Sequence, residues 1–177
     1  MIRRTILAAL AATGLVLATG AYAASPDNTL ILETSKGKVT IELKPDLAPK
    51  HVAQIKTLVG KHFYDGIIFH RVIEGFMAQT GDPTGTGMGG SDLPDIPGEF
   101  SKAHFGRGAV GMARSQDPNS ANSQFFIMFD DGSFLDGQYT VWGEVTDGMD
   151  VVDKINRGEP PANPDKIVKA RLASDPN

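Results

Sequence analysis

The pattern of apolar and polar residues after position 28 predicts a chain built mainly from short β-strands. Segments 29–34 and 38–43 are two runs of strand-forming residues, and apolar and polar residues alternate in the second. Ser35-Lys36-Gly37 between them favours a tight turn, so we expect a hairpin. Six further runs complete a set of eight predicted strands: 67–72, 76–79, 108–113, 123–129, 139–145 and 166–172.

Two other segments have helical spacing. In segment 46–60, Val52, Ile55 and Val59 recur on one face, and a glycine ends the run. A second helix is predicted over roughly 148–156. Because eight antiparallel strands lose their exposed edges when the sheet closes on itself, we predict a mainly β fold: a closed eight-stranded antiparallel β-barrel capped by two α-helices.

The segment from Gly81 to Gly98 is rich in Gly and Pro and poor in apolar residues, which predicts a long surface loop. Within it, Gly85–Gly90 matches the spacing G-x-G-x-x-G. The residues that follow, Ser91–Pro94, cannot begin the helix that binds the phosphates of a dinucleotide. We therefore predict no nucleotide cofactor.

Residues 1–23 have the features of a secretory signal peptide. Arg3 and Arg4 precede an apolar run, and Ala21-Tyr22-Ala23 forms a small-x-small cleavage site. A transmembrane anchor is the alternative, but the apolar run is shorter than the ~20 residues that a spanning helix needs. The paired arginines leave a twin-arginine export route open. We expect cleavage before Ala24, one domain over residues 24–177, and a periplasmic protein with no membrane attachment after processing.

The composition limits the possible partners. The chain has 177 residues and no cysteine, which excludes disulfides and a thiol nucleophile although the predicted compartment is oxidising. Loss of Arg3 and Arg4 with the signal peptide leaves 15 basic and 21 acidic residues, a formal charge of −6. An acidic chain without a basic run is a poor partner for nucleic acid. We expect a soluble monomer.

Two common catalytic motifs are absent from the sequence, although a Ser-His-Asp triad need not show a motif. None of the four histidines, His51, His62, His70 and His104, pairs with another at the spacing of a zinc motif, so no metal is predicted. There is also no G-x-S-x-G nucleophile elbow, which gives little support to a serine hydrolase.

The stretch from Phe69 to Asp82 places a cation beside an apolar strand, with Phe, Met and Gln near it. It reads FHRVIEGFMAQTGD and resembles the signature of the cyclophilin family. Segments Ser123–Ile127 (SQFFI) and Phe134–Gly137 (FLDG) resemble the second and third blocks of that family, in the same order. The resemblance covers essentially the whole chain after the signal peptide. It implies a peptidyl-prolyl cis/trans isomerase without a cofactor, acting on proline-containing unfolded or partly folded polypeptides.

The resemblance also implies roles for individual residues. Arg71 is similar to the family's catalytic arginine, and Gln79 is similar to its substrate-orienting glutamine. Four apolar residues correspond to the pocket that holds the proline ring: Phe76, Met77, Phe126 and Leu135.

Four more residues are expected to bind the rest of the substrate. Ala113 and Arg114 fall where the family binds the substrate backbone, and Gln124 and Gly87 occupy positions of its groove. Arg114 replaces the usual asparagine, so a backbone contact at this position would be retained and a side-chain contact would not.

The rim of the pocket departs from the best-known eukaryotic members. Phe134 replaces a tryptophan and Tyr139 replaces a histidine. Because phenylalanine lacks the indole N–H that a tryptophan offers to cyclosporin, we predict weak cyclosporin binding. A non-catalytic peptide-binding chaperone or assembly module on the same fold is the alternative function, since a fold does not fix an activity.

Overall fold

The computed structural model describes residues 24–175, and β-strands dominate this part of the chain. The predicted signal peptide lies outside the described residues. In chain order the elements are η1 (Pro26–Asn28), β1 (Thr29–Thr34), β2 (Gly37–Leu43), α1 (Pro49–Gly60), β3 (Arg71–Ile73), β4 (Met77–Thr80), β5 (Ala109–Met112), β6 (Phe125–Met128), η2 (Ser133–Leu135), β7 (Val141–Asp147), α2 (Met149–Val152) and β8 (Ile167–Leu172).

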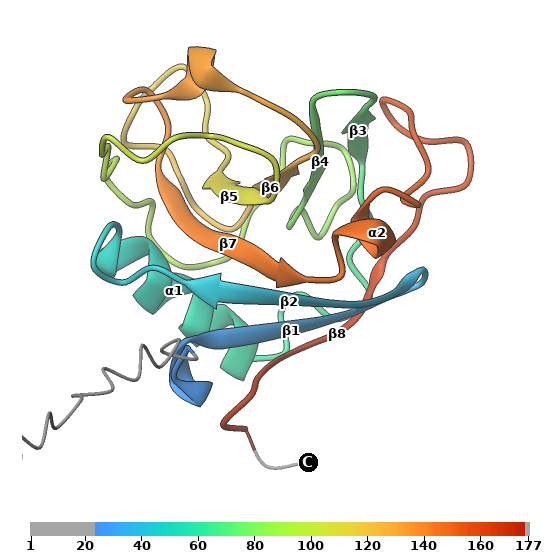
Figure 1. Cartoon of the computed structure of the whole chain (residues 1–177), viewed down its shortest axis with the longest axis horizontal. Coiled ribbons are helices and arrows are strands. Elements are labelled where there is room, and N and C mark those ends of the chain that lie inside the picture. Colours follow the sequence, from blue (N-terminus) through green and yellow to red (C-terminus); the bar gives the residue numbers. More distant parts are fainter. Residues whose placement is uncertain (1–23, 176–177) are drawn as a thin grey trace, which may run out of the picture.

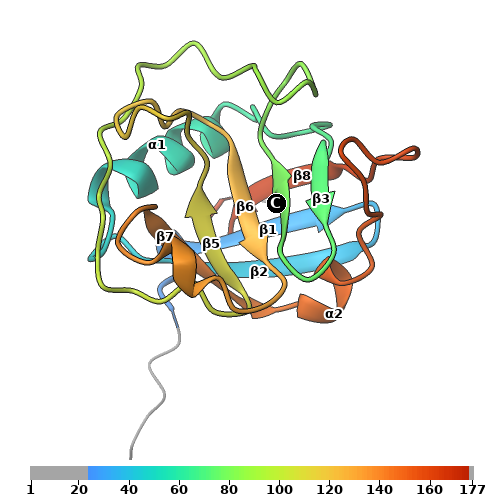
Figure 2. The same ribbon diagram turned by 90° about the horizontal axis from the view of Figure 1, so that it is seen from above.

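All eight strands belong to one antiparallel sheet with the order β3-β4-β6-β5-β7-β2-β1-β8. The sheet curls, so that β3, β4, β5 and β6 lie across β1, β2 and β8, while α1 covers one open end (Figures 1 and 2). The prediction of a mainly β fold with eight antiparallel strands and two helices is confirmed.

The predicted closure of the barrel is wrong, because the sheet is open between its edge strands β3 and β8. Within the described residues only two isolated bridges cross this gap, Val72 with Gly158 and Ile68 with Lys166. The chain between 158 and 166 contains three prolines, which have no backbone N–H to donate to a ladder. This segment therefore covers the gap as a loop and does not form a ninth strand.

The predicted hairpin forms β1 and β2, with Leu32 opposite Val39. Alternate residues of both strands are buried, as the sequence pattern predicts. At the turn, Gly37 has φ of +136°, a conformation that side chains rarely adopt, and its carbonyl accepts a hydrogen bond from Thr34 Oγ1 at 2.8 Å.

Helix α1 begins at Pro49, which suits the first turn because its missing N–H would have no partner within the helix. The preceding Ala48 provides no side-chain cap. The Glu99 carboxylate, from a distant loop, accepts hydrogen bonds from the backbone N–H groups of Lys50 and His51 at 3.0–3.1 Å. A carboxylate at a helix N-terminus also interacts favourably with the helix dipole.

Two predicted elements are shorter than expected. Helix α2 covers only Met149–Val152, because beyond Asp153 the hydrogen bonds join residues three apart and the N–H of Asn156 bonds to the Asp165 carboxylate at 2.8 Å. The predicted strand 67–72 becomes β3 at its end, while its first residues make only scattered hydrogen bonds to the chain around β8.

The apolar core has two parts, on opposite faces of the strands that they share. In β6, Phe125 and Ile127 belong to the larger cluster beneath α1, while Phe126 and Met128 belong to the smaller one. The smaller cluster, called the second apolar cluster below, consists of Met77, Phe105, Ala109, Phe126, Met128, Leu135 and Val141.

Among the described residues, no helix has the length and apolar character required to cross a membrane.

Candidate active site

Strand pairing places the predicted catalytic residue and two of the predicted substrate-binding residues in one row across the sheet. Arg71 lies opposite Gln79 on the neighbouring strand, and Gln79 lies opposite Phe126 on the next. Directly paired residues project from the same face of a sheet. The arginine, the glutamine and the aromatic ring therefore share one face, although Arg71 and Phe126 are 55 positions apart in the chain.

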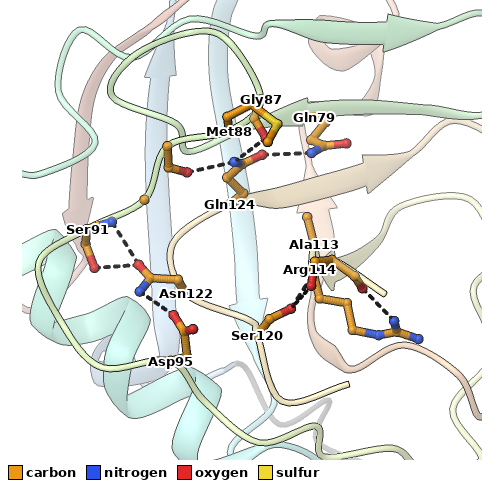
Figure 3. Close-up of a pocket in the computed structure, with 13 residues that line it drawn as sticks. Gln79, Gly87, Met88, Ser91, Asp95, Ala113, Arg114, Ser120, Asn122 and Gln124 are labelled. Carbon is orange, nitrogen blue, oxygen red and sulfur yellow. Dashed lines mark hydrogen bonds between the residues drawn. The ribbon is translucent and has the colours of Figure 1, made fainter. Parts of the chain in front are cut away.

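A chain of side-chain hydrogen bonds continues from this row. Arg71 Nη1 lies 3.5 Å from Gln79 Oε1, and Gln79 Nε2 donates to Gln124 Oε1 at 2.9 Å. Gln124 Nε2 then donates to the carbonyls of Gly87 at 3.0 Å and Gly89 at 2.8 Å (Figure 3). Each amide is oriented by its neighbours. Segment 83–90, called the glycine loop below, is therefore linked to Arg71 through two glutamines.

A cavity of about 500 Å³ opens beside these glutamines. The glycine loop forms one wall and the segment after β5 forms the other, where the N–H of Ala113 donates to the carbonyl of Gln124 at 2.9 Å. The lining is mostly polar and includes five of the predicted residues: Gln79, Gly87, Ala113, Arg114 and Gln124.

The four predicted pocket residues lie apart from this cavity. Met77, Phe126 and Leu135 belong to the second apolar cluster and are only 1%, 5% and 7% exposed. Phe76 is partly buried and packs against the same cluster. The structure therefore brings these four residues together, but much of their surface is covered by neighbouring core residues.

The two rim residues differ in exposure. Phe134 is 61% exposed, and its ring centroid lies 5.4 Å from that of Phe76. Tyr139 is partly buried, and its ring meets that of Phe126 edge-on at 6.1 Å. Both rings thus border the predicted proline pocket.

The Arg114 side chain turns away from Gln124 (Figure 3) and reaches Tyr139 at the rim. Its guanidinium carbon lies 4.3 Å from the centroid of Tyr139, and it donates hydrogen bonds to the carbonyls of Ser115 and Gln138, both at 2.8 Å. Such stacking is typical of arginine. The side chain therefore connects the cavity wall with the rim.

The glycine loop is shaped by Asp82, to which the sequence analysis assigned no role. The buried carboxylate accepts hydrogen bonds from the backbone N–H groups of Thr84, Thr86, Gly87 and Gly89 at 2.6–3.2 Å. Burial opposes its ionisation, but the hydrogen bonds from Thr84 and from the loop backbone outweigh burial and lower the pKa of Asp82 to about 2. An aspartate directly before a glycine-rich loop was the available signal.

Glu159 was also not predicted. Its Oε2 accepts a hydrogen bond from Arg71 Nε at 2.8 Å. The two residues are 88 positions apart in the chain. The sequence signal near Glu159 is its neighbouring Gly and Pro residues, and these predict only a loop. Within residues 24–175, no three His, Asp or Glu side chains are arranged to hold a metal ion.

Comparison with known proteins identifies the family of this chain. Residues 29–172 match the family described as cyclophilin type peptidyl-prolyl cis-trans isomerase/CLD. A probable peptidyl-prolyl cis-trans isomerase of Brucella suis is 58% identical, covering 96% of this chain and 97% of its own. A peptidyl-prolyl cis-trans isomerase of Schizosaccharomyces pombe is 41% identical over 78% of this chain and 95% of its own.

Solved structures that are similar to this chain belong to the same family. The crystal structure of the cyclophilin AquaCyp293 from Hirschia baltica is similar with a TM-score of 0.81 and 36% identity, over 87% of this chain and 77% of that one. A cyclophilin type isomerase from Cryptosporidium parvum, crystallised in the presence of the dipeptide Ala-Pro, is similar with a TM-score of 0.77 and 29% identity, over 83% and 99%. This chain belongs to the family of cyclophilin type peptidyl-prolyl cis-trans isomerases.

Proposed function

We propose that this peptidyl-prolyl isomerase acts on exported polypeptides in the periplasm, as a monomer, and that Arg71 is its catalytic residue. The observation that carries the catalytic assignment is the row of Arg71, Gln79 and Phe126 on one face of the sheet. It combines a fixed cation, an amide that can orient a peptide group and an apolar ring beside them.

The reaction needs no covalent intermediate. Rotation about a peptide bond has a barrier of about 18–20 kcal/mol because resonance gives the C–N bond partial double-bond character. At a prolyl bond the cis form costs only about 0.5–1 kcal/mol, so both isomers are populated and the catalyst has only to favour the twisted state between them.

Arg71 can favour that state selectively. In the twisted amide the prolyl nitrogen regains a lone pair, which can accept a hydrogen bond that the planar amide cannot. A donor that binds only the twisted form lowers the barrier without tightening ground-state binding. Arginine suits this role because it stays protonated and presents a rigid set of donors.

The remaining predicted residues divide the work of holding the substrate. Phe76, Met77, Phe126 and Leu135 would hold the proline ring by apolar contact, bordered by Phe134 and Tyr139. Gln79, with Gly87, Ala113, Arg114 and Gln124, would hold the rotating chain on the polar side, where the cavity lies. Holding one side while the other rotates requires no cofactor.

The decisive experiment compares the wild type with Arg71→Ala and Arg71→Lys in an assay of prolyl isomerisation. We expect kcat/KM to fall by about 10²–10³ in Arg71→Ala, the usual loss for one transition-state donor, and to stay low in Arg71→Lys. Thermal unfolding of the same samples controls for folding. Undiminished turnover in folded Arg71→Ala would refute the catalytic assignment.

Export is tested separately. The apolar run and the small-x-small site of residues 1–23 support it. We expect N-terminal sequencing of the periplasmic fraction to begin at Ala24. Retention of the full-length chain in the cytoplasm would contradict export without affecting the enzymatic assignment.

A further inference from the structure

Two different groups contact the Arg71 guanidinium. Its Nε donates to Glu159 Oε2 at 2.8 Å, and its Nη1 lies 3.5 Å from Gln79 Oε1, a long contact. No hydrogen bond from Nη2 is found within the described residues. The carboxylate therefore provides the short, charge-assisted contact, and it does so at Nε, away from the two terminal nitrogens.

The segment that carries Glu159 is fixed on strand β3 itself. Gly158 exchanges two backbone hydrogen bonds with Val72, at 2.8 and 2.9 Å, directly next to Arg71. A Cβ atom at Gly158 would lie 2.5 Å from the Cα of Pro161, so only glycine fits this turn. The carboxylate is thus presented from a backbone that is tied to the arginine's own strand.

We infer that Glu159 is a positioning residue for Arg71, and this inference rests on the catalytic role proposed above. A guanidinium is planar and its donors diverge at fixed angles, so a bond at Nε restricts both the plane and the direction of the two Nη groups. Fixing the group in advance removes the cost of ordering it in the transition state. Gln79 then completes the alignment from the other side.

The ion pair is poorly placed to stabilise the fold. The side chains of Arg71 and Glu159 are 41% and 53% exposed, and exposed pairs contribute little to folding free energy. A carboxylate that holds an exposed arginine beside Gln79, which lines the cavity, is better explained by the orientation it imposes. Loss of Glu159 should therefore change turnover and leave the thermal midpoint almost unchanged.

The chain contains a matched control. Arg157 Nε donates to Glu74 Oε2 at 2.6 Å, so the same two atom types pair as in the contact between Arg71 and Glu159. Like that contact, it joins the chain before β8 to the chain around β3. The side chain of Glu74 is 77% exposed, and it does not contact Arg71 through any hydrogen bond in the described residues. Glu74→Ala thus removes an equivalent ion pair at a neighbouring position.

The experiment measures kcat and KM separately for Glu159→Ala, Glu159→Gln and Glu74→Ala. We expect Glu159→Ala to lower kcat about two- to fivefold, the range for one exposed pair, with KM nearly unchanged. Glu159→Gln keeps an acceptor oxygen and should recover most of the loss. Glu74→Ala should match the wild type. In an arginine-selective ¹H–¹⁵N spectrum, the Arg71 Nε–Hε signal should move in Glu159→Ala and stay in place in Glu74→Ala.

A double mutant separates the two proposals. If Arg71 is catalytic and Glu159 acts through it, Glu159→Ala should have no further effect on turnover in the Arg71→Ala background. A normal kcat in Glu159→Ala, while Arg71→Ala is inactive, would overturn the positioning role alone. An equal loss of kcat in Glu159→Ala and Glu74→Ala would also overturn it, because the effect would then be general to the ion pairs of this region. Full activity of Arg71→Ala would overturn the proposed function itself.

Discussion

The second apolar cluster and the glycine loop, which flank the row of Arg71, Gln79 and Phe126, are built by opposite means. The cluster consists mainly of strand and short-helix residues that are almost fully buried, such as Met77, Phe126 and Leu135. The loop contains few apolar residues and is held by the Asp82 carboxylate and by Gln124. The apolar side of the proposed substrate-binding site is thus stabilised by burial, and the polar side by hydrogen bonds, most of which go to the single charge of Asp82.

This difference predicts different responses to perturbation. Burial responds to lost volume and scarcely to pH, because no charge is involved. A loop organised by a carboxylate responds to protonation, because each of its hydrogen bonds is stronger to the ionised group. Substitutions in the second apolar cluster and in the glycine loop should therefore separate the stability of the fold from the shape of the proposed binding site.

The largest effect is expected from Phe126→Ala. The ring stacks on Phe105 at 5.7 Å and is 5% exposed, so its removal should lower the free energy of unfolding by about 3–5 kcal/mol. Urea denaturation at neutral pH measures this loss, and Phe126→Leu provides the milder control. A loss below about 1 kcal/mol would show that the second apolar cluster is not stabilised by burial.

A smaller and pH-dependent effect is expected from Asp82→Asn. The pKa of Asp82 is lowered in the folded protein to about 2, below its unfolded value of about 3.9. The ionised carboxylate therefore contributes about 2–3 kcal/mol, which is fully present above about pH 5 and is lost progressively as the pH falls to about 1. We expect the difference in unfolding free energy between wild type and variant to shrink over that range. A difference that does not change with pH would contradict the role of the charge.

The smallest effect on stability is expected from Phe134→Trp. Because Phe134 is 61% exposed, the substitution should change the free energy of unfolding by less than about 0.5 kcal/mol. It adds an indole N–H at the rim, so cyclosporin should bind about tenfold more tightly, the equivalent of one hydrogen bond. Calorimetric titration of both proteins measures this change, and equal dissociation constants would contradict it.

The sequence predicted the elements whose pattern is local. Helix α1 was predicted from Val52, Ile55 and Val59, which are all buried, and its end at Gly60 agrees with the structure. The shortened α2 could not be predicted, because it depends on the Asp165 carboxylate binding Asn156 from outside the helix. The open edge of the sheet likewise depends on how the prolines between 158 and 166 pack.

The residues of the candidate site also divide into those with a local sequence pattern and those that depend on distant contacts. The residues in strands, Arg71, Gln79 and Phe126, were predicted from motifs, and strand pairing brings them together. Asp82 and Glu159 were not predicted. The position of Asp82 before a glycine-rich segment is a signal in the sequence, but its contacts, like that of Glu159, depend on the conformation of a loop. The family roles of the predicted residues stay predictions until the substitutions are made.

The pairing of Gly158 with Val72 restricts how a polypeptide can approach this protein. Many peptide-binding domains accept a ligand as an additional strand on a free sheet edge. Here the backbone N–H and C=O of Val72 are already used by Gly158. A client chain therefore cannot extend the sheet at the arginine-bearing strand. The proposed substrate would therefore be bound on the face of the sheet that carries Arg71, Gln79 and Phe126, and not as an added strand.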